Sequence, residues 1–197
     1  VYDNYATVIN ASAVTCRDKW FQQACLTNRD TACLNWMADT FFANAEIAAP
    51  MPFGALHNAI IAGNLPAAKW LVERWGAIIH GRPSIKQEVV KSLDATCSNG
   101  YQDMLEWAIQ TFAISRDNVI TNNECTLLKQ AASRGRTEIM LFLIQTFGLT
   151  REHVTAADHN CMRLALGGGY PITVKLLMRI GQYSVKELIA MEPEYWN

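Results

Sequence analysis

Apolar residues along this chain recur at the spacing of helices rather than of strands. In the stretch AAKWLVERW, Ala67, Trp70 and Leu71 are three and four positions apart, and the stretch TEIMLFLIQTF (137–147) keeps the same period. Few segments alternate between apolar and polar residues, and no two such segments flank an Asn-Gly or Asp-Gly hairpin turn. We therefore predict an all-α fold in which strands are not indicated.

The chain also repeats itself. AIQTFAISRDNV (Ala108 to Val119) and LIQTFGLTREHV (Leu143 to Val154) share an identical phrase and agree in residue type beyond it, about 35 positions apart. A period of this length is typical of repeat proteins. We align the copies on a small turn residue, because glycine tolerates the left-handed conformation that ends a helix and asparagine is its usual substitute. The five anchors are Asn28, Gly63, Gly100, Gly135 and Gly169.

Other positions keep their type from copy to copy. An apolar residue precedes each anchor by seven positions and a small residue precedes it by four, as Leu56 and Ala59 do before Gly63. Seven positions after the anchor stands a large apolar residue in most copies, namely Trp70, Trp107, Phe142 and Leu176. We interpret each copy as a short helix, a tight turn, a longer helix and a connector, stacked on its neighbours. The small residues are expected to let hairpins approach, and the large ones, tryptophans included, to pack in the core.

One copy, ALHNAIIAGNLPAAKWLVERWGA (Ala55 to Ala77), resembles the ankyrin repeat, whose phrase is Thr-Pro-Leu-His-x-Ala-x-x-x-Gly followed by a Leu-Leu helix and Gly-Ala. The positions that fit are Leu56, His57, Ala59, Gly63, Leu71, Val72, Gly76 and Ala77. The other copies fit less well but keep the frame, so that the resemblance covers roughly Phe21 to Gln182. The opening Thr-Pro is absent, and Gly54 and Ala55 stand there in the best copy.

The connectors depart from the ordinary ankyrin pattern, in which a β-hairpin finger lies between units. Here helix-start residues stand at Ser84, Ser115, Thr150 and Ser184. Ser84 with Gln87, and Ser184 with Glu187, have the spacing of a capping box. We expect short helical turns largely in place of the fingers. This pattern is similar to the divergent, long-connector ankyrin repeats of protists, amoebae and large DNA viruses.

The resemblance implies an ankyrin-like helical-hairpin solenoid of about five repeats in a single domain over 1–197. The predicted segments are an N-terminal cap (1–20), repeats at 21–52, 53–90, 91–124, 125–160 and 161–183, and a C-terminal cap (184–197). Terminal caps are expected because an open end of such an array exposes its core.

Composition narrows the classes of function. Half of the residues are hydrophobic, 18% are charged, and the formal net charge is −1. This composition predicts a folded core and no strong attraction to nucleic acid or an anionic membrane. No apolar run approaches the length of a membrane span. The chain starts at Val1 and is therefore either a processed mature protein or a fragment of a longer array.

No constellation of residues indicates catalysis or a metal. The six cysteines form no C-x-x-C pair. Secretion would allow one disulfide among Cys16, Cys25 and Cys33, and we leave that alternative open. For most of the six cysteines we favour the interpretation as small buried apolar side chains. The four histidines fall at unrelated phases of the repeat, and no phosphate loop or nucleophile motif is present. We therefore predict no enzymatic activity and no cofactor.

The resemblance implies a protein–protein interaction module that binds its target through the concave face of the inner helices. Mapping the phase of each copy onto that face selects Asn58, Asn99, Asn122, Asn123, Lys129, Gln130, Arg134, His159, Asn160 and Arg163. Lys129, Arg134 and Arg163 either steer a partner with an acidic surface or form only a solvated face.

We expect a monomer that binds one or more proteins. It is either secreted to act on host proteins inside a host cell, as a pathogen's effector does, or cytoplasmic. The alternative function is a small-ligand-binding or enzymatic all-α protein that only mimics repeats.

Overall fold

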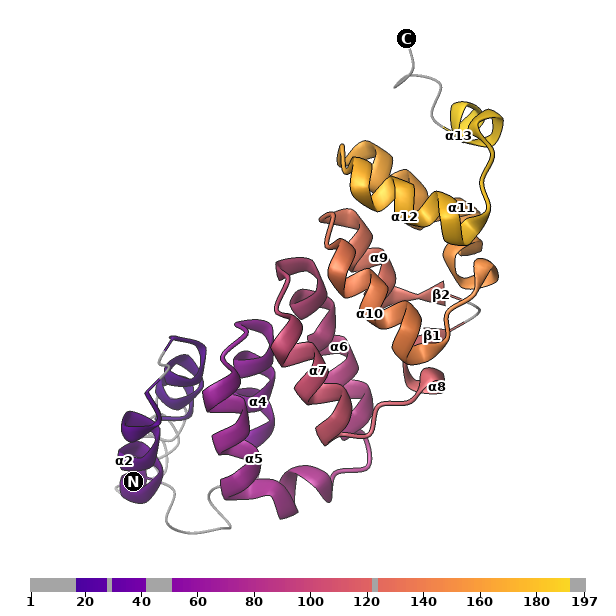
Figure 1. The fold of residues 1–197 in the computed structure, drawn as a ribbon. Helices are drawn as coiled ribbons and strands as arrows, with labels where there is room; N and C mark the ends of the chain where they lie inside the picture. Colours follow the sequence, from indigo (N-terminus) through magenta and orange to yellow (C-terminus); the bar gives the residue numbers. More distant parts are fainter. Residues whose placement is uncertain (1–16, 28–29, 42–50, 122–123, 192–197) are drawn as a thin grey trace, which may run out of the picture. The chain divides into compact units, whose positions relative to one another are not determined.

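The computed structural model describes residues 17–27, 30–41, 51–121 and 124–191, and helices make up almost all of them (Figure 1). The prediction of an all-α protein is confirmed. Packing divides the chain into two compact units, Val1–Glu88 and Val89–Asn197, which we call unit 1 and unit 2. Their boundary lies inside a helix, two residues before the predicted end of the repeat at 53–90. The structure thus describes the predicted N-terminal cap only from residue 17 and the C-terminal cap only to residue 191.

Unit 1 consists of two helical hairpins and the start of a further helix. Its elements are a helix over 17–27, α2 (Thr31–Phe41), α4 (Met51–Ile61), α5 (Leu65–His80) and the first turn of α6 (Ile85–Asn99). Phe21 is fully buried, and its ring lies 6.1 Å from that of Trp70 and 5.7 Å from that of Trp75. This aromatic cluster joins the first hairpin to the second.

Unit 2 continues the series of hairpins. Its elements after α6 are α7 (Gln102–Thr111), α8 (Arg116–Val119), β1 (Ile120–Thr121), β2 (Glu124–Cys125), α9 (Thr126–Ser133), α10 (Thr137–Phe147), α11 (Arg151–Gly167), α12 (Pro171–Gly181) and α13 (Val185–Met191). α9 packs against both α10 and α11, and α12 packs against α11 and α10. In Figure 1 the outer helices α7, α10 and α12 lie in front of α6, α9 and α11.

The turn inside each described hairpin has the same geometry. Gly63, Gly100, Gly135 and Gly169 all have positive φ, between 63° and 88°. In each turn the residue after the glycine donates its backbone N–H to the carbonyl of the small residue four positions before the glycine, at 2.9–3.1 Å. These acceptors, Ala59, Thr96, Ala131 and Ala165, are fully buried. The aligned glycines and small residues of the sequence are therefore the two ends of one repeated capping motif. The first anchor, Asn28, lies outside the described residues.

The large apolar residues after each turn are less buried than the sequence suggests. Trp70, Trp107, Phe142 and Leu176 are each only partly buried, whereas the next residue in each copy is fully buried: Leu71, Ala108, Leu143 and Leu177. These large residues therefore pack at the edge of the core, where the rings of Trp70 and Trp107 contact the buried rings of Phe21 and Phe112, and the fully buried position is the next one along the helix. The aromatic position lies at the side of the outer helix and reaches the preceding hairpin, where the indole N–H of Trp70 donates to Asn35 at 2.8 Å.

The second helix of the best ankyrin-like copy does not end at its glycine. α5 continues through Gly76 to His80, with a kink at Trp75 (φ −126°, ψ 25°). In contrast, α10 ends at Phe147, and Gly148 follows in the left-handed conformation (φ 58°), as the phrase QTFGL predicts. The difference shows that Gly–Ala alone does not end this type of helix.

Short helical segments do occupy the connectors. α8 follows Ser115, which forms a capping box with Asn118, and α11 begins after Thr150, which forms one with His153. Ser184 and Glu187 form the predicted box before α13, and the hydrogen bonds from Ser184 lower the pKa of the Glu187 carboxyl. Before α6 the partner of the Ser84 hydroxyl is Glu88, at 2.6 Å, one position beyond the predicted Gln87.

One connector also contains two short strands that the sequence pattern did not indicate. β1 pairs antiparallel with β2, with Ile120 opposite Cys125 and Thr121 opposite Glu124. Each strand has only two residues, and such a length is too short to show an alternating pattern in the sequence. A small hairpin therefore follows the helical turn in this connector.

The described cysteines are free thiols. Cys25, Cys97, Cys125 and Cys161 are buried and Cys33 is exposed. No disulfide joins Cys25 to Cys33, and Cys16 lies outside the described residues. Burial raises the pKa of Cys25 to about 12 and that of Cys125 to about 11. The interpretation of most cysteines as small buried apolar side chains holds for these four.

No helix in the described part of the chain is long and apolar enough to cross a bilayer.

Two leucines of α10 test the assignment of its buried side. Leu143 is fully buried, whereas Leu141 is 39% exposed. We expect Leu143→Ala to lower the free energy of unfolding by about 2–5 kcal/mol, because it leaves a cavity in the core. Leu141→Ala is the matched control, with an expected loss below about 1 kcal/mol. Urea unfolding followed by circular dichroism measures both, and equal losses would contradict the assignment.

Candidate functional site

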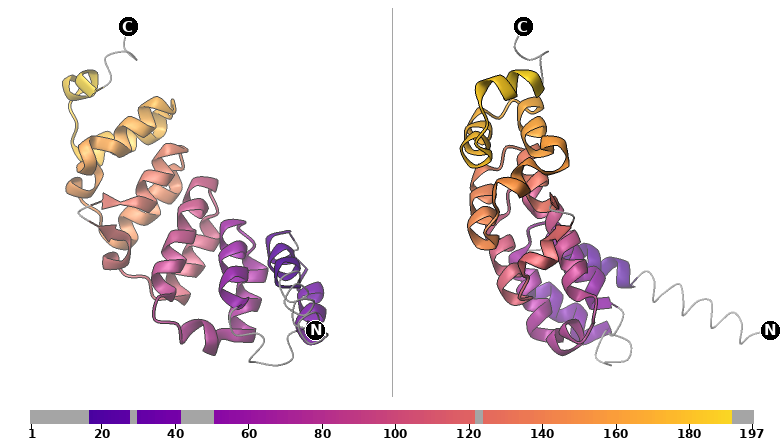
Figure 2. Two further views of the ribbon diagram at one scale, coloured as in Figure 1. Left: turned by 180° about the vertical axis from the view of Figure 1, so that it is seen from behind. Right: turned by 90° about the vertical axis from the view of Figure 1, so that its right-hand side faces the viewer.

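The inner helices of unit 2 present the surface on which most of the predicted binding residues lie. We define the inner face as the outward side chains of α6 from Val89 onward, of α9 and of the later part of α11 (160–167), with the described connector residues before them (120, 124–125 and 156–159). The view from behind turns this row of helices towards the reader (Figure 2, left). The hydroxyl of Ser98 on α6 donates to the amide oxygen of Gln130 on α9 at 3.1 Å and so links two neighbouring inner helices.

Three predicted residues do not belong to this described face. Asn58 lies on α4 in unit 1, where its side-chain amide is 3.5 Å from the carbonyl oxygen of Gln22. Asn58 thus joins the two hairpins of unit 1. Asn122 and Asn123 lie outside the described residues.

Two of the predicted basic residues form ion pairs with acids at the connector tips. Nζ of Lys129 is 2.8 Å from Oε2 of Glu124, and Nη2 of Arg163 is 3.1 Å from Oδ2 of Asp158. In both pairs the acid precedes the base by five positions, in the stretches ECTLLK and DHNCMR. This shared spacing is a signal in the sequence that the predicted site did not include.

These pairs change the electrostatic character of the face. The four bases of the face, Lys91, Lys129, Arg134 and Arg163, exceed its three acids, Asp94, Glu124 and Asp158, by only one. The inner face of unit 2 is therefore not the basic patch that its cations alone suggested. Lys129 and Arg163 each connect an inner helix to the connector before it, through Glu124 and Asp158 respectively.

Asp94 is a further residue that no sequence motif selected. It is half-buried on α6, and its Oδ1 is buried without a hydrogen-bond partner among the described residues. Burial raises the pKa of its carboxyl, and the nearby Lys129 opposes this shift. Asp94 stands at the position of the ankyrin histidine, so its type alone gave no hint that one oxygen would be buried.

The remaining predicted residues differ in how freely they face outward. Nδ1 of His159 is 2.8 Å from the hydroxyl of Tyr183, so this side chain links two connectors. Asn99 and Arg134 are exposed, and Asn160 is half-buried. No hydrogen bond or ion pair joins the side chains of these last three to any other described residue. They are the part of the predicted site that is open to an external partner.

The connector tip before Asn160 has an unusual backbone. Ala157, Asp158 and His159 all have left-handed φ and ψ, with φ of 51°, 54° and 60°. Each such residue costs about 1–2 kcal/mol when it is not glycine. Such strain often accompanies binding sites. Asp158 and His159 are residue types that enter the left-handed region more often than most, but no local pattern indicated three such residues in succession, Ala157 included.

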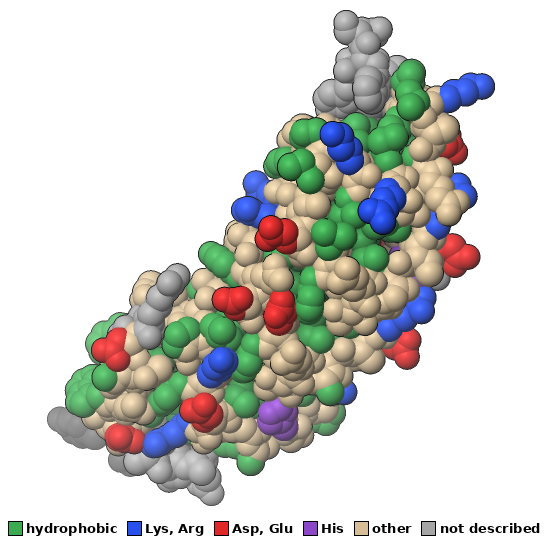
Figure 3. Space-filling view, viewed as in Figure 1, with side chains coloured by type: hydrophobic (Ala, Val, Ile, Leu, Met, Phe, Trp, Pro, Cys, Tyr) green, Lys and Arg blue, Asp and Glu red, His purple; other side chains and the backbone are tan. Residues whose placement is uncertain are grey.

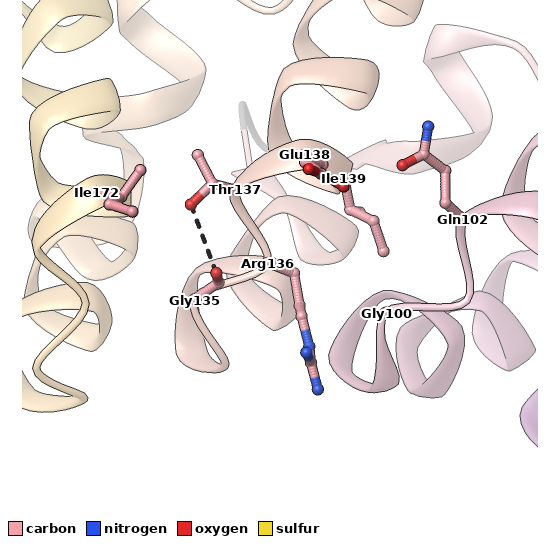
Figure 4. A pocket seen from close by; sticks show the side chains of 8 residues that line it. All are labelled: Gly100, Gln102, Gly135, Arg136, Thr137, Glu138, Ile139 and Ile172. Atoms are coloured by element: carbon pink, nitrogen blue, oxygen red, sulfur yellow. Dashed lines mark hydrogen bonds between the residues drawn. The ribbon is translucent and has the colours of Figure 1, made fainter.

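A groove of about 430 Å³ lies at the opposite end of the hairpins, beside their turns (Figure 4). Its lining combines turn glycines, polar side chains and two isoleucines: Gly100, Gln102, Gly135, Arg136, Thr137, Glu138, Ile139 and Ile172. Arg136 crosses the groove wall, where its Nε donates to the carbonyl of Ser98 at 3.1 Å. The groove holds one acid and one base, and no pair of groups arranged for proton transfer distinguishes it as an active centre.

The outer face of unit 2, which we define as the outward side chains of α7, α10 and α12, exposes large apolar side chains. Leu141 and Ile172 expose 39% and 70% of their surface, and Figure 3 shows hydrophobic side chains over these outer helices.

Within the described ranges, no three His, Cys, Asp or Glu side chains lie close enough together to hold a metal ion.

Comparison of the chain with protein-family models, with curated proteins and with solved structures found no match. Any assignment of function must therefore come from the chain itself.

The buried oxygen of Asp94 predicts a pH-dependent effect of Asp94→Asn. Because the folded-state pKa is raised, protonation of Asp94 stabilises the fold below the ordinary pKa of about 4, and this contribution is lost as pH rises through the raised pKa. Asparagine does not titrate, so the stability of Asp94→Asn relative to the parent protein should increase from about pH 4 to about pH 7. Urea unfolding at both pH values measures the difference, and a constant difference would contradict burial of an ionised carboxylate.

The left-handed turn predicts that glycine stabilises it. Ala157 is exposed, so Ala157→Gly removes little packing while relieving the strain at φ 51°. We expect the free energy of unfolding to rise by about 0.5–1 kcal/mol. Ala156→Gly is the matched control, since Ala156 has an ordinary φ of −55° and glycine there should stabilise nothing. Thermal unfolding measures both variants, and an equal change in the two would contradict strain at Ala157.

Proposed function

We propose that this chain is a divergent, ankyrin-like protein-interaction module without catalysis of its own. The observation that carries the proposal is the repeated turn: the described hairpins place a positive-φ glycine and the same backbone hydrogen bond at intervals of about 35 residues. A stack of such hairpins exposes a regular row of inner helices, and stacked repeats generally use such rows to bind other proteins. The resemblance of ALHNAIIAGNLPAAKWLVERWGA to the ankyrin phrase supports the same interpretation.

Contacts between neighbouring hairpins support the repeat assignment within each unit. In unit 1, Trp70 bonds to Asn35, the residue at the same phase of the preceding copy. In unit 2, the hydroxyls of Thr137 and Thr173, both in the first turn of an outer helix but two positions apart in phase, are 2.8 Å from each other. Such pairs are expected when successive hairpins stack with little offset.

We propose that the inner face of unit 2 is the binding surface. Three of its side chains, Asn99, Arg134 and Asn160, have no hydrogen bond or ion pair within the described part of the chain. Amide and guanidinium groups of this kind supply hydrogen bonds to a partner without a large loss of internal stability. Arg134 is a cation of this face that forms no ion pair within the described residues, so a partner with an acidic surface remains part of the proposal.

A charge reversal at Arg134 tests the surface. Arg134→Glu should reduce retention of the partner about tenfold in a pull-down from cell extract, because it replaces a donor with a repulsive charge. Arg179→Glu is the matched control, since Arg179 is exposed on the outer helix α12. A partner lost with Arg134→Glu and kept with Arg179→Glu supports the inner face.

Lys129 and Arg163 are left unchanged in this experiment, because each is paired with a tip acid and its reversal would disturb the fold. Loss of the partner with Arg179→Glu alone would move the site to the outer face. If neither the parent nor either variant retains a protein while all three remain helical, the interaction proposal fails and the small-ligand alternative gains.

A further inference from the structure

The left-handed turn at Ala157, Asp158 and His159 lies within the proposed binding surface, so any role for it in recognition rests on the proposed function. The turn has no glycine, although all three residues have φ between 51° and 60°. Asp158 is its central residue, and 81% of the Asp158 side chain is exposed. Single residues of this type occur in many proteins, but three in succession need specific contacts to hold them.

One residue holds the centre of the turn by two contacts. Nε of Arg163 donates to the main-chain carbonyl of Asp158 at 3.1 Å, and Nη2 of the same guanidinium is 3.1 Å from Oδ2 of Asp158. The guanidinium thus fixes the backbone and the side chain of one residue together. His159 adds a contact at the end of the turn, where Nδ1 is 2.8 Å from the Tyr183 hydroxyl and the two rings are 5.3 Å apart.

The balance between strain and contacts at this turn is close. An exposed ion pair contributes little to stability, and the Arg163 side chain is 42% exposed. Three consecutive left-handed residues cost more than one such pair returns. The Arg163 contacts therefore hold the turn together with the hydrogen bond between His159 and Tyr183. Once the share of Arg163 is removed, we expect the remaining contacts to be too weak to keep the turn in the left-handed region.

The second ion pair of the inner face provides an internal comparison. Lys129 pairs with Glu124 at the same spacing of five, but Glu124 lies in the paired strand β2 rather than in a left-handed turn. Loss of that pair releases no comparable strain. The two ion pairs share their charges and spacing, but only the Arg163 pair restrains a left-handed backbone.

We propose that the turn at 157–159 is a strained latch that Arg163 keeps closed, and that an acidic side chain of the partner opens it by replacing Asp158 on the guanidinium of Arg163. The internal carboxylate occupies the place of a ligand, and both members of the pair are accessible from outside. A partner carboxylate gains the same charge-assisted hydrogen bonds, and the strain of the turn is released at the same time. The partner chemistry that fits this site is an acidic, carboxylate-bearing segment of protein.

A double-mutant cycle tests the latch without any partner. Ala157→Gly should shift the folding equilibrium of the parent protein about fivefold towards the folded state, because it relieves left-handed strain. In the Arg163→Ala background the same change should gain less than about twofold, because the turn has already left that conformation. In the Lys129→Ala background the full gain should remain. Equal gains in all three backgrounds would overturn the latch.

Arg163→Lys is a second background that keeps the positive charge. A lysine cannot hold the carbonyl and the carboxylate of Asp158 with one planar group, so its behaviour should match that of Arg163→Ala. If the gain from Ala157→Gly is instead the same in the Arg163→Lys background as in the parent, charge alone holds the turn and the proposed clamp is wrong.

The partner chemistry is tested by amide spectra of the ¹⁵N-labelled full chain. A peptide of alternating glutamate and glycine is added, and its counterpart with glutamine in place of glutamate serves as control. The glutamate peptide should move the resonances of 157–159 towards their positions in Arg163→Ala, and the glutamine peptide should not. No movement, or equal movement with both peptides, overturns the assignment of a carboxylate partner.

The latch and the proposed function can fail separately in these experiments. If the effect of Ala157→Gly depends on Arg163 but no protein is retained in the pull-down, the latch is supported and the interaction proposal fails. A partner that depends on Arg134 but an uncoupled cycle leaves the interaction module standing and removes the latch.

Discussion

One backbone hydrogen bond sets the geometry of each of the four hairpins whose turn the structure describes. The residue after the turn glycine donates to the carbonyl of a small residue five positions earlier, and this bond requires the glycine to be left-handed. The acceptor must be small because the paired helix passes close to it, and Ala59, Thr96, Ala131 and Ala165 are accordingly fully buried. Leucines one helical turn earlier, such as Leu56 and Leu93, then fill the core between hairpins. The fold is the repetition of this unit.

Because the turns repeat with nearly constant spacing, equivalent side chains of neighbouring hairpins come together. Some of these meetings are hydrogen bonds, as between Trp70 and Asn35, and some combine charges, as between Arg74 and Asp39. The inner helices gain a row of polar side chains in the same way. We propose that this row carries the binding function, because it holds outward polar side chains such as Asn99 and Arg134 that make no hydrogen bond or ion pair within the described residues.

The connectors decide which charges of this row are open to a partner. In the connector before α9, Glu124 forms an ion pair with Lys129 of that helix, and in the connector before the later part of α11, Asp158 forms one with Arg163. Lys129 and Arg163 are therefore already paired within the chain, and a partner has to compete with Glu124 and Asp158 for them. At Asp158 this contact also restrains a strained backbone, so that stability and recognition are coupled at one point of the surface.

The sequence by itself determined the helical class, the repeat period, the turn glycines and most of the buried positions, because each depends on local spacing that the chain writes out several times. It also indicated the caps at Ser115, Thr150 and Ser184, since capping is a local interaction. Only the tertiary structure decided that Trp70 and Trp107 lie at the side of their helices, because one position along a helix turns a side chain by about 100° and the period does not resolve it. Likewise, the pairing of Lys129 and Arg163, the buried oxygen of Asp94 and the left-handed turn at Ala157 depend on how a connector folds back. That path is set by contacts between distant residues and not by the local pattern.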